Sequence, residues 1–141
     1  MKITAHVQNS HNHHHITLST NDTAHTIPIP PKSSGYGSSA NGGELLFLAL
    51  ATCYCNDIYR EAAKRGIEVT AVAVTVDGDF GAAGEPARNV TYSAKVTGRG
   101  SAAELEALMQ HTDTVAEIQN TLRAGASVIL ENIEVESLST Q

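Results

Sequence analysis

Cysteine, basic residues and long apolar runs are all scarce in this sequence of 141 residues. Its two cysteines are too few for a secreted domain built on several disulfides, so we expect both thiols to be reduced. The longest apolar run, residues 45–55, is far shorter than the roughly 18 to 20 residues of a membrane-spanning helix. The chain also opens without a charged and then apolar signal segment, so we expect a cytoplasmic protein with no membrane partner.

The shortage of basic residues argues against a nucleic-acid partner. Nine lysines and arginines face fifteen acidic residues, which gives a net charge of −6 and a pI near 5.5, whereas a nucleic-acid interface needs a clustered basic face. The phosphate-binding patterns GxGxxG and GxxxxGK[ST] and the serine-hydrolase pattern GxSxG are also absent. We therefore expect no nucleotide chemistry and no cofactor.

What is present indicates one globular α+β domain spanning residues 1–141. Short segments of alternating apolar and polar residues in the first thirty positions predict two or three antiparallel strands. A loop rich in proline and glycine follows, and then a long helix over residues 42–65, with Asn41 and Glu44 as a capping box and Gly66 as its stop. We expect the apolar first half of this helix, which contains the cysteines, to be enclosed.

The second half of the chain predicts four more elements. β-Branched, alternating residues indicate strands at 67–76 and 89–96, on either side of a loop at 77–88. Two further capping boxes, Ser101 with Glu104 and Thr114 with Glu117, predict two short helices, the second of which ends at Gly125. Residues 126–136 predict a last strand with one buried and one wet face.

Cys53 is the nucleophile with the most suggestive surroundings. It lies about three turns into the long helix, beyond the useful range of that helix's dipole, and burial alone would raise its pKa. A nearby cation or hydrogen-bond network would have to stabilise a thiolate, and without one a buried helical cysteine is a small apolar residue. Cys55 points about 200° away on the same helix, so a disulfide between the two would require the helix to unfold.

Four histidines, His11, His13, His14 and His15, resemble a metal-binding tract. On a strand, His13 and His15 would share a face, which makes a two-ligand site conceivable. Zinc sites usually have three or four protein ligands, and no cysteine or carboxylate cluster accompanies this tract. We expect a solvated hairpin and no physiological metal site, with His13 and His15 as weak candidate ligands.

Residues 41–66, NGGELLFLALATCYCNDIYREAAKRG, followed by IEV, resemble the OsmC/Ohr family of osmotically inducible and organic-hydroperoxide-resistance proteins. The predicted order of elements fits that family over nearly the whole chain. The resemblance implies an α+β fold in which two chains intertwine as a homodimer around central helices. It also implies thiol-dependent reduction of hydroperoxides, with Cys53 at the position of the peroxidatic cysteine and an Arg and a Glu that activate it.

The sequence departs from the family's pattern at three positions. Thr114 stands where the resolving cysteine would be, and Gly43 stands where the hydroperoxide reductases have a catalytic Glu. Glu44 matches a more widespread family Glu and is either a helper of catalysis or, as we favour, a helix cap. The loop arginine is missing, which leaves Lys32 as a cation that could stabilise the thiolate but lacks arginine's planar fork.

Two hypotheses follow, with the first slightly favoured. In the first, Cys53 reduces an organic hydroperoxide and an external thiol reductant regenerates it, with Cys55 as a secondary thiol. In the second, a non-catalytic dimer binds a small hydrophobic ligand near Cys53, and a redox sensor is a further alternative. A Cys53 pKa above about 8.5, the value of a free thiol, would argue against the enzyme.

Overall fold

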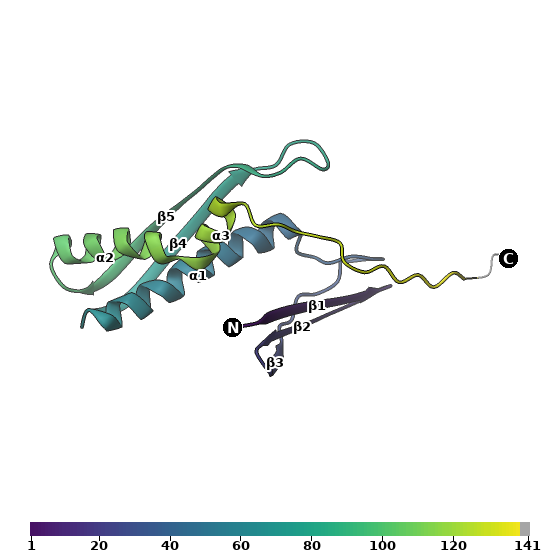
Figure 1. The fold of residues 1–141 in the computed structure, drawn as a ribbon, viewed down its shortest axis with the longest axis horizontal. Helices are drawn as coiled ribbons and strands as arrows, with labels where there is room; N and C mark the ends of the chain where they lie inside the picture. The colour runs from purple at the N-terminus through teal and green to yellow at the C-terminus, as the bar shows by residue number, and fades with distance from the viewer. Residues whose placement is uncertain (139–141) are drawn as a thin grey trace. The chain divides into compact units, whose positions relative to one another are not determined.

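The computed structural model describes residues 1–138, which confirm the α+β class (Figure 1). The chain forms two compact units: residues 1–52 with 74–94, and residues 53–73 with the chain from 95 onward. None of the helices in the described chain is long and apolar enough to cross a membrane. In order, the elements are β1 (Ile3–Ser10), β2 (His13–Thr20), β3 (Thr23–Thr26), α1 (Gly42–Lys64), β4 (Glu68–Asp79), β5 (Arg88–Arg99), α2 (Ala102–Val115) and α3 (Glu117–Ala124).

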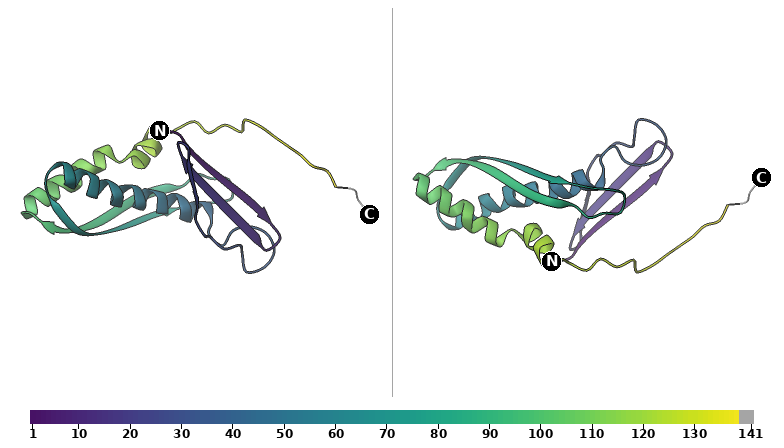
Figure 2. Two further views of the ribbon diagram at one scale, coloured as in Figure 1. Left: turned by 90° about the horizontal axis from the view of Figure 1, so that it is seen from below. Right: turned by 90° about the horizontal axis from the view of Figure 1, so that it is seen from above.

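The first unit contains an antiparallel sheet in the order β1-β2-β3, as predicted (Figure 2). Its two tight turns use Asn12 and Asn21, whose φ angles of 62° and 53° lie in the left-handed region that asparagine tolerates. Ile16 on β2 is buried, whereas every residue of β1 is exposed. Each of these three strands is therefore held mainly by its ladder of backbone hydrogen bonds.

Helix α1 begins and ends as predicted. The Asn41 side chain accepts a hydrogen bond from the Glu44 backbone N–H at 2.8 Å, and the Glu44 carboxylate accepts one from the Asn41 N–H at 3.0 Å. Gly66, with a φ of 65°, follows the last turn. The expectation of an enclosed first half is wrong, because Leu48 is 59% exposed and the fully buried side chain on α1 is Ile58, in its second half.

Strands β4 and β5 pair in a hairpin and are longer than predicted, because the ladder continues over polar residues of the expected loop. Within the first unit, the rings of Phe47 and Phe80 lie 5.9 Å apart between centroids. Gly78 lies directly against Phe47, and a Cβ at this position would come within 2.6 Å of the ring. The glycine is therefore needed for close packing between the strand and the ring.

Helix α2 starts with the predicted capping box, in which Ser101 and Glu104 exchange hydrogen bonds with each other's backbone N–H. The prediction that Thr114 caps α3 is wrong. Thr114 lies inside α2 and donates its hydroxyl proton to the His111 carbonyl at 2.6 Å, so that the helix continues through it. The N-cap of α3 is Ala116, which provides no side-chain hydrogen bond, and Gly125 ends α3 in the left-handed conformation as predicted.

The predicted C-terminal strand at residues 126–136 is not formed. Residues 126–138 belong to no helix or strand, and their apolar side chains are exposed, with Val128 at 95% and Val135 at 84%. A strand exists only when a neighbouring strand pairs with its backbone, and this stretch has no such partner within the described chain. Alternation of apolar and polar residues indicates a preference for an extended backbone, but it does not indicate whether another strand is available to pair with it.

Because Ser101 caps α2 and Thr114 does not cap α3, the two positions should respond differently to alanine. We predict that Ser101→Ala lowers the free energy of unfolding by about 1 kcal/mol, since one N-terminal N–H loses its acceptor. Thr114→Ala should change it by less than about 0.5 kcal/mol, because alanine's helix propensity offsets the lost hydroxyl contact. Urea unfolding of both variants measures the difference, and equal losses would contradict the assignment of the caps.

Candidate functional site

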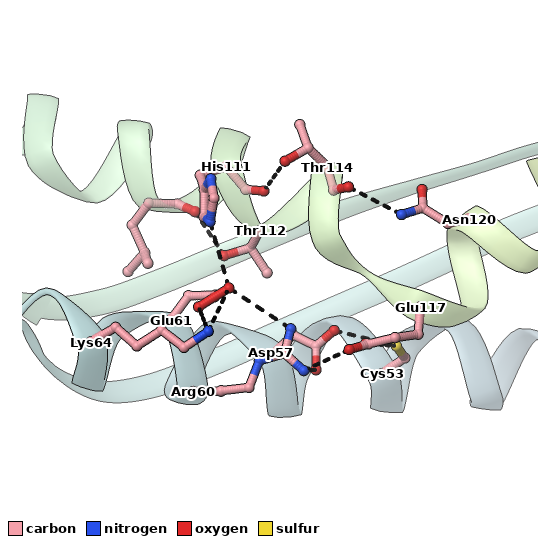
Figure 3. Close-up of polar contacts among 11 residues, drawn as sticks. Cys53, Asp57, Arg60, Glu61, Lys64, His111, Thr112, Thr114, Glu117 and Asn120 are labelled. Carbon is pink, nitrogen blue, oxygen red and sulfur yellow. Dashed lines mark hydrogen bonds and ion pairs between the residues drawn. The ribbon is translucent and has the colours of Figure 1, made fainter. Parts of the chain in front are cut away.

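The site forms in the second unit, around the Cys53 thiol on α1 (Figure 3). Cys53 is half-buried, and its sulfur lies 3.5 Å from Asp57 Oδ2 and 3.7 Å from Glu117 Oε2. Cys53 and Asp57 share a helix face because four residues separate them. Glu117 comes from the first turn of α3, 64 positions along the chain from Cys53. The thiol proton is therefore offered to two carboxylates from two helices.

Arg60 holds the other oxygens of the same two carboxylates. Its Nη1 lies 2.7 Å from Glu117 Oε1 and 3.1 Å from Asp57 Oδ1. Each carboxylate thus directs one oxygen to the guanidinium group and the other to the Cys53 sulfur. The guanidinium group contacts the two carboxylates and not the sulfur. It therefore acts on Cys53 indirectly, by compensating part of the carboxylates' negative charge.

The start of α3 also contributes to the site. Ala116 gives the helix no side-chain cap, and the backbone N–H of Ile118, in the first turn, acts to lower the pKa of the Cys53 thiol. Free N–H groups and the dipole at a helix N-terminus favour a negatively charged acceptor. Cys53 receives this help from α3 and not from its own helix.

The balance of these effects raises the pKa of the Cys53 thiol above its ordinary value of 9.0. Burial is the largest cause, and the charges of Asp57 and Glu117 add to it, while the Ile118 N–H acts in the opposite direction. Hydrogen bonds, first from Asp57 and then from its own backbone N–H and Arg60, hold the pKa of Glu117 at about 2. Burial and the neighbouring Glu117 raise the pKa of Asp57.

A second set of contacts fixes α1 against α2. Glu61, which is buried, lies 2.9 Å from Lys64 Nζ and 3.5 Å from His111 Nε2. The Tyr54 hydroxyl donates to the Met109 carbonyl at 2.8 Å, and burial there raises the pKa of Tyr54 to about 12. The Glu61–His111 and Tyr54–Met109 contacts join α1 to α2, whereas the Glu61–Lys64 pair lies within α1. Figure 3 shows the contacts of Glu61 beside the site.

The other candidate residues lie elsewhere. Lys32 and Glu44 belong to the first unit, where the Glu44 carboxylate serves as the helix cap described above. Both Cys53 and Cys55 are free thiols. Among residues 1–138, three side chains that could ligate a metal come together at one place, formed by Cys53, Asp57 and Glu117. His13 and His15 do not belong to such a group.

Sequence reasoning missed Asp57, Arg60 and Glu117 as members of the site. The spacing of Cys53, Asp57 and Arg60, at i, i+4 and i+7, places them along one face of the helix and was a usable signal. Glu117 left no such signal, because its role in a capping box explained its position within α3 and nothing local connects it to α1. Only the packing of α3 against α1 brings it to the sulfur.

Comparison with known proteins agrees with this fold. The family described as OsmC-like protein matches residues 35–131. None of the curated proteins matches the sequence significantly.

Among solved structures, the chain is similar to the OsmC-like protein from Mycoplasma pneumoniae, with 18% identity, a TM-score of 0.60, and coverage of 88% of this chain and 87% of that one. It is also similar to an OsmC-like protein of unknown function from Vibrio cholerae, with 15% identity, a TM-score of 0.59, and 86% and 93% coverage. A third is the organic hydroperoxide resistance protein OsmC from Legionella pneumophila, with 18% identity, a TM-score of 0.55, and 87% and 90% coverage.

At these low sequence identities, the solved structures show only that the fold is shared. The family match, however, spans more than half of the chain and includes the whole of α1 with Cys53. The fold, the order of elements and the family match agree, and the chain belongs to the OsmC family.

Proposed function

We propose that this protein reduces organic hydroperoxides at Cys53, and that an external thiol regenerates the cysteine. The observation that supports this most directly is that Cys53, at the position of the family's peroxidatic cysteine, lies beside the uncapped first turn of α3, where the Ile118 N–H acts to lower its pKa. An N–H held in that position stabilises the thiolate, which is the reactive form of cysteine. Two structural neighbours are described as organic hydroperoxide resistance proteins, which is consistent with this chemistry.

In the proposed reaction, the Cys53 sulfur bonds to the terminal oxygen of the hydroperoxide and the O–O bond breaks. The alcohol leaves with the proton that the thiol gives up, and Cys53 becomes a sulfenic acid. An external thiol then attacks this sulfur, releases water and forms a mixed disulfide, and a second thiol frees Cys53. The external reductant is required because Thr114 occupies the expected position of a resolving cysteine and Cys55 points away from Cys53 on α1.

The two carboxylates lower the fraction of Cys53 present as thiolate and so limit the rate of this reaction. By the criterion stated above, a Cys53 pKa raised above that of a free thiol argues against the enzyme, because Asp57 and Glu117 both keep the proton on Cys53. The proposal is therefore supported by the position of Cys53 in the family, and it is a proposal for a slow reaction at neutral pH. The same charged groups make an apolar ligand at the sulfur a poor fit, which favours the peroxide reaction over hydrophobic binding at this position. We therefore expect a peroxidase whose rate is limited by the small thiolate fraction.

The first prediction concerns pH. In metal-free protein with chelator present, the rate of Cys53 oxidation by cumene hydroperoxide should rise about tenfold per pH unit from pH 6 to 8, because the thiolate fraction rises in that proportion below the pKa. Intact-mass spectrometry with a sulfenic-acid trap measures the rate. Cys55→Ser should keep the adduct and Cys53→Ser should lose it. A rate that does not change with pH, or an adduct that persists in Cys53→Ser, would contradict the proposal.

The second prediction concerns the charges beside the thiol. Glu117→Gln removes a negative charge 3.7 Å from the sulfur, so the pKa of Cys53 should fall and oxidation at pH 7 should be about three- to tenfold faster. Arg60→Gln should act in the opposite direction, since it leaves both carboxylates uncompensated. Thiolate absorbance during a pH titration measures the pKa. Glu106→Gln, an exposed change on α2, is the matched control and should leave both quantities unchanged.

We also propose that the protein is a homodimer. Residues 126–138 form an exposed, extended, apolar stretch, and Leu48 on the apolar half of α1 is 59% exposed. A second copy would supply both a strand partner for that stretch and a cover for that helix face. The alternation of Ile133 and Val135 with Glu134 and Glu136 gives such a strand one apolar face.

Light scattering at micromolar concentration should therefore give twice the 14.9 kDa mass of one chain. Ile133→Asp should shift the protein to the single-chain mass, because it places a charge on the apolar face of the segment. Glu134→Gln, its neighbour on the opposite face, should leave the dimer intact. A single-chain mass for the unmodified protein would rule out the dimer.

A further inference from the structure

Cys53, Asp57 and Glu117 bring three ligand atoms together from two helices. The Cys53 Sγ, one Asp57 oxygen and one Glu117 oxygen all lie within 4.8 Å of one another. The two sulfur–oxygen separations are 3.5 and 3.7 Å. In a tetrahedral zinc site, bond lengths of about 2.3 Å to sulfur and 2.0 Å to oxygen place these atoms about 3.5 Å apart. The two sulfur–oxygen separations thus match those around a bound cation, and the two oxygens lie within 4.8 Å of each other.

The groups behind these atoms are those that orient metal ligands. Arg60 binds Glu117 Oε1 and Asp57 Oδ1, which directs the remaining oxygen of each carboxylate toward the sulfur. Contacts of this kind fix the direction of a ligand and are typical of the outer shell of metal sites.

Charge also favours a cation at this point. Once metal binding has ionised both carboxylates, they and one guanidinium leave one uncompensated negative charge beside Cys53, and the Cys53 thiolate adds a second. A divalent cation balances both charges, so that the cation, its three ligands and Arg60 together are neutral. A thiolate is a soft ligand, and the metals that accept one thiolate with oxygen ligands are those of the zinc class, not magnesium or calcium.

The site is open on one side. The Glu117 side chain is 59% exposed, whereas that of Asp57 is 9% exposed. A cation can enter from the exposed side, and water can take the fourth position, as in zinc sites with three protein ligands.

We propose that Cys53, Asp57 and Glu117 form a binding site for a thiophilic divalent cation of the zinc class, with Arg60 as its outer shell. On binding, the S–H bond of Cys53 breaks, the proton passes to solvent and a sulfur–metal bond forms. No atom changes its oxidation state. Metal binding does not require the peroxide reaction to occur, because it needs only the reduced thiol and the two carboxylates, although both use the Cys53 sulfur.

Cobalt(II) is the probe for the test, because cobalt bound to a thiolate gives a charge-transfer absorption band that zinc does not. Titration of the reduced full-length protein with cobalt under anaerobic conditions should produce this band with one equivalent bound, and added zinc should abolish it. Cys53→Ser should lose the band, and Glu117→Gln should weaken binding at least tenfold. Glu117→Gln tests the site without unfolding the protein, since its side chain is largely exposed.

Two variants serve as matched controls. Cys55→Ser keeps Cys53 and should retain the band, and the His13→Ala/His15→Ala double variant should retain it as well. A band that survives in Cys53→Ser, or that is lost in Cys55→Ser or in the histidine variant, would overturn the assignment of ligands. The absence of a band at millimolar cobalt would overturn the site itself. Because no peroxide is used, either result leaves the proposed peroxidase to its own test.

Discussion

The contact between Arg60 on α1 and Glu117 on α3 is the interaction on which the site depends. It joins residues 57 positions apart, brings the first turn of α3 to Cys53, and so places the Glu117 carboxylate at the sulfur. Both side chains of the pair are substantially exposed, at 39% and 59%, and such pairs contribute only about 0 to 1 kcal/mol. The pair therefore fixes position, while burial of apolar residues beneath it supplies the stability.

That burial comes from the helices of the second unit. Ile58, Leu108 and Ala116 are fully buried, and the Thr112 hydroxyl, also buried, donates to the Leu108 carbonyl at 2.7 Å. The polar site lies at the border of this core, where α1 changes from apolar to charged residues. Cys53 therefore has a buried environment on one side and carboxylates on the other, and this combination keeps its proton in place.

The same three ligands can hold either a proton or a metal ion, and this links the two proposals. A proton on Cys53 and a cation at its sulfur exclude each other, so metal affinity should rise with pH just as thiolate reactivity does. Organic hydroperoxide then meets a thiol, a thiolate or a metal-bound sulfur according to the conditions. The carboxylates that slow peroxide reduction at Cys53 are the same groups that the proposed metal site requires as ligands.

The sequence predicted those elements whose signals are local. The capping boxes at Asn41 and Ser101 and the glycine stops at Gly66 and Gly125 were correct, because a cap depends on residues within one turn. The prediction of a cap at Thr114 was wrong, because a threonine hydroxyl can instead donate a hydrogen bond to a carbonyl of its own helix, as Thr114 does to His111. The cysteine of the site was found through its family position. Its partner Glu117 was not, because a contact between distant helices has no local pattern.

The extended segment at residues 126–138 affects how the protein should be handled. Its run of valine, isoleucine and leucine, with few interrupting charges near its start, is the kind of sequence that adds to any available sheet edge. If a second copy covers it, dilution raises the fraction of chains in which this segment is uncovered. Proteolysis within residues 126–138 would then cut a larger share of the chains per unit time in dilute than in concentrated solution.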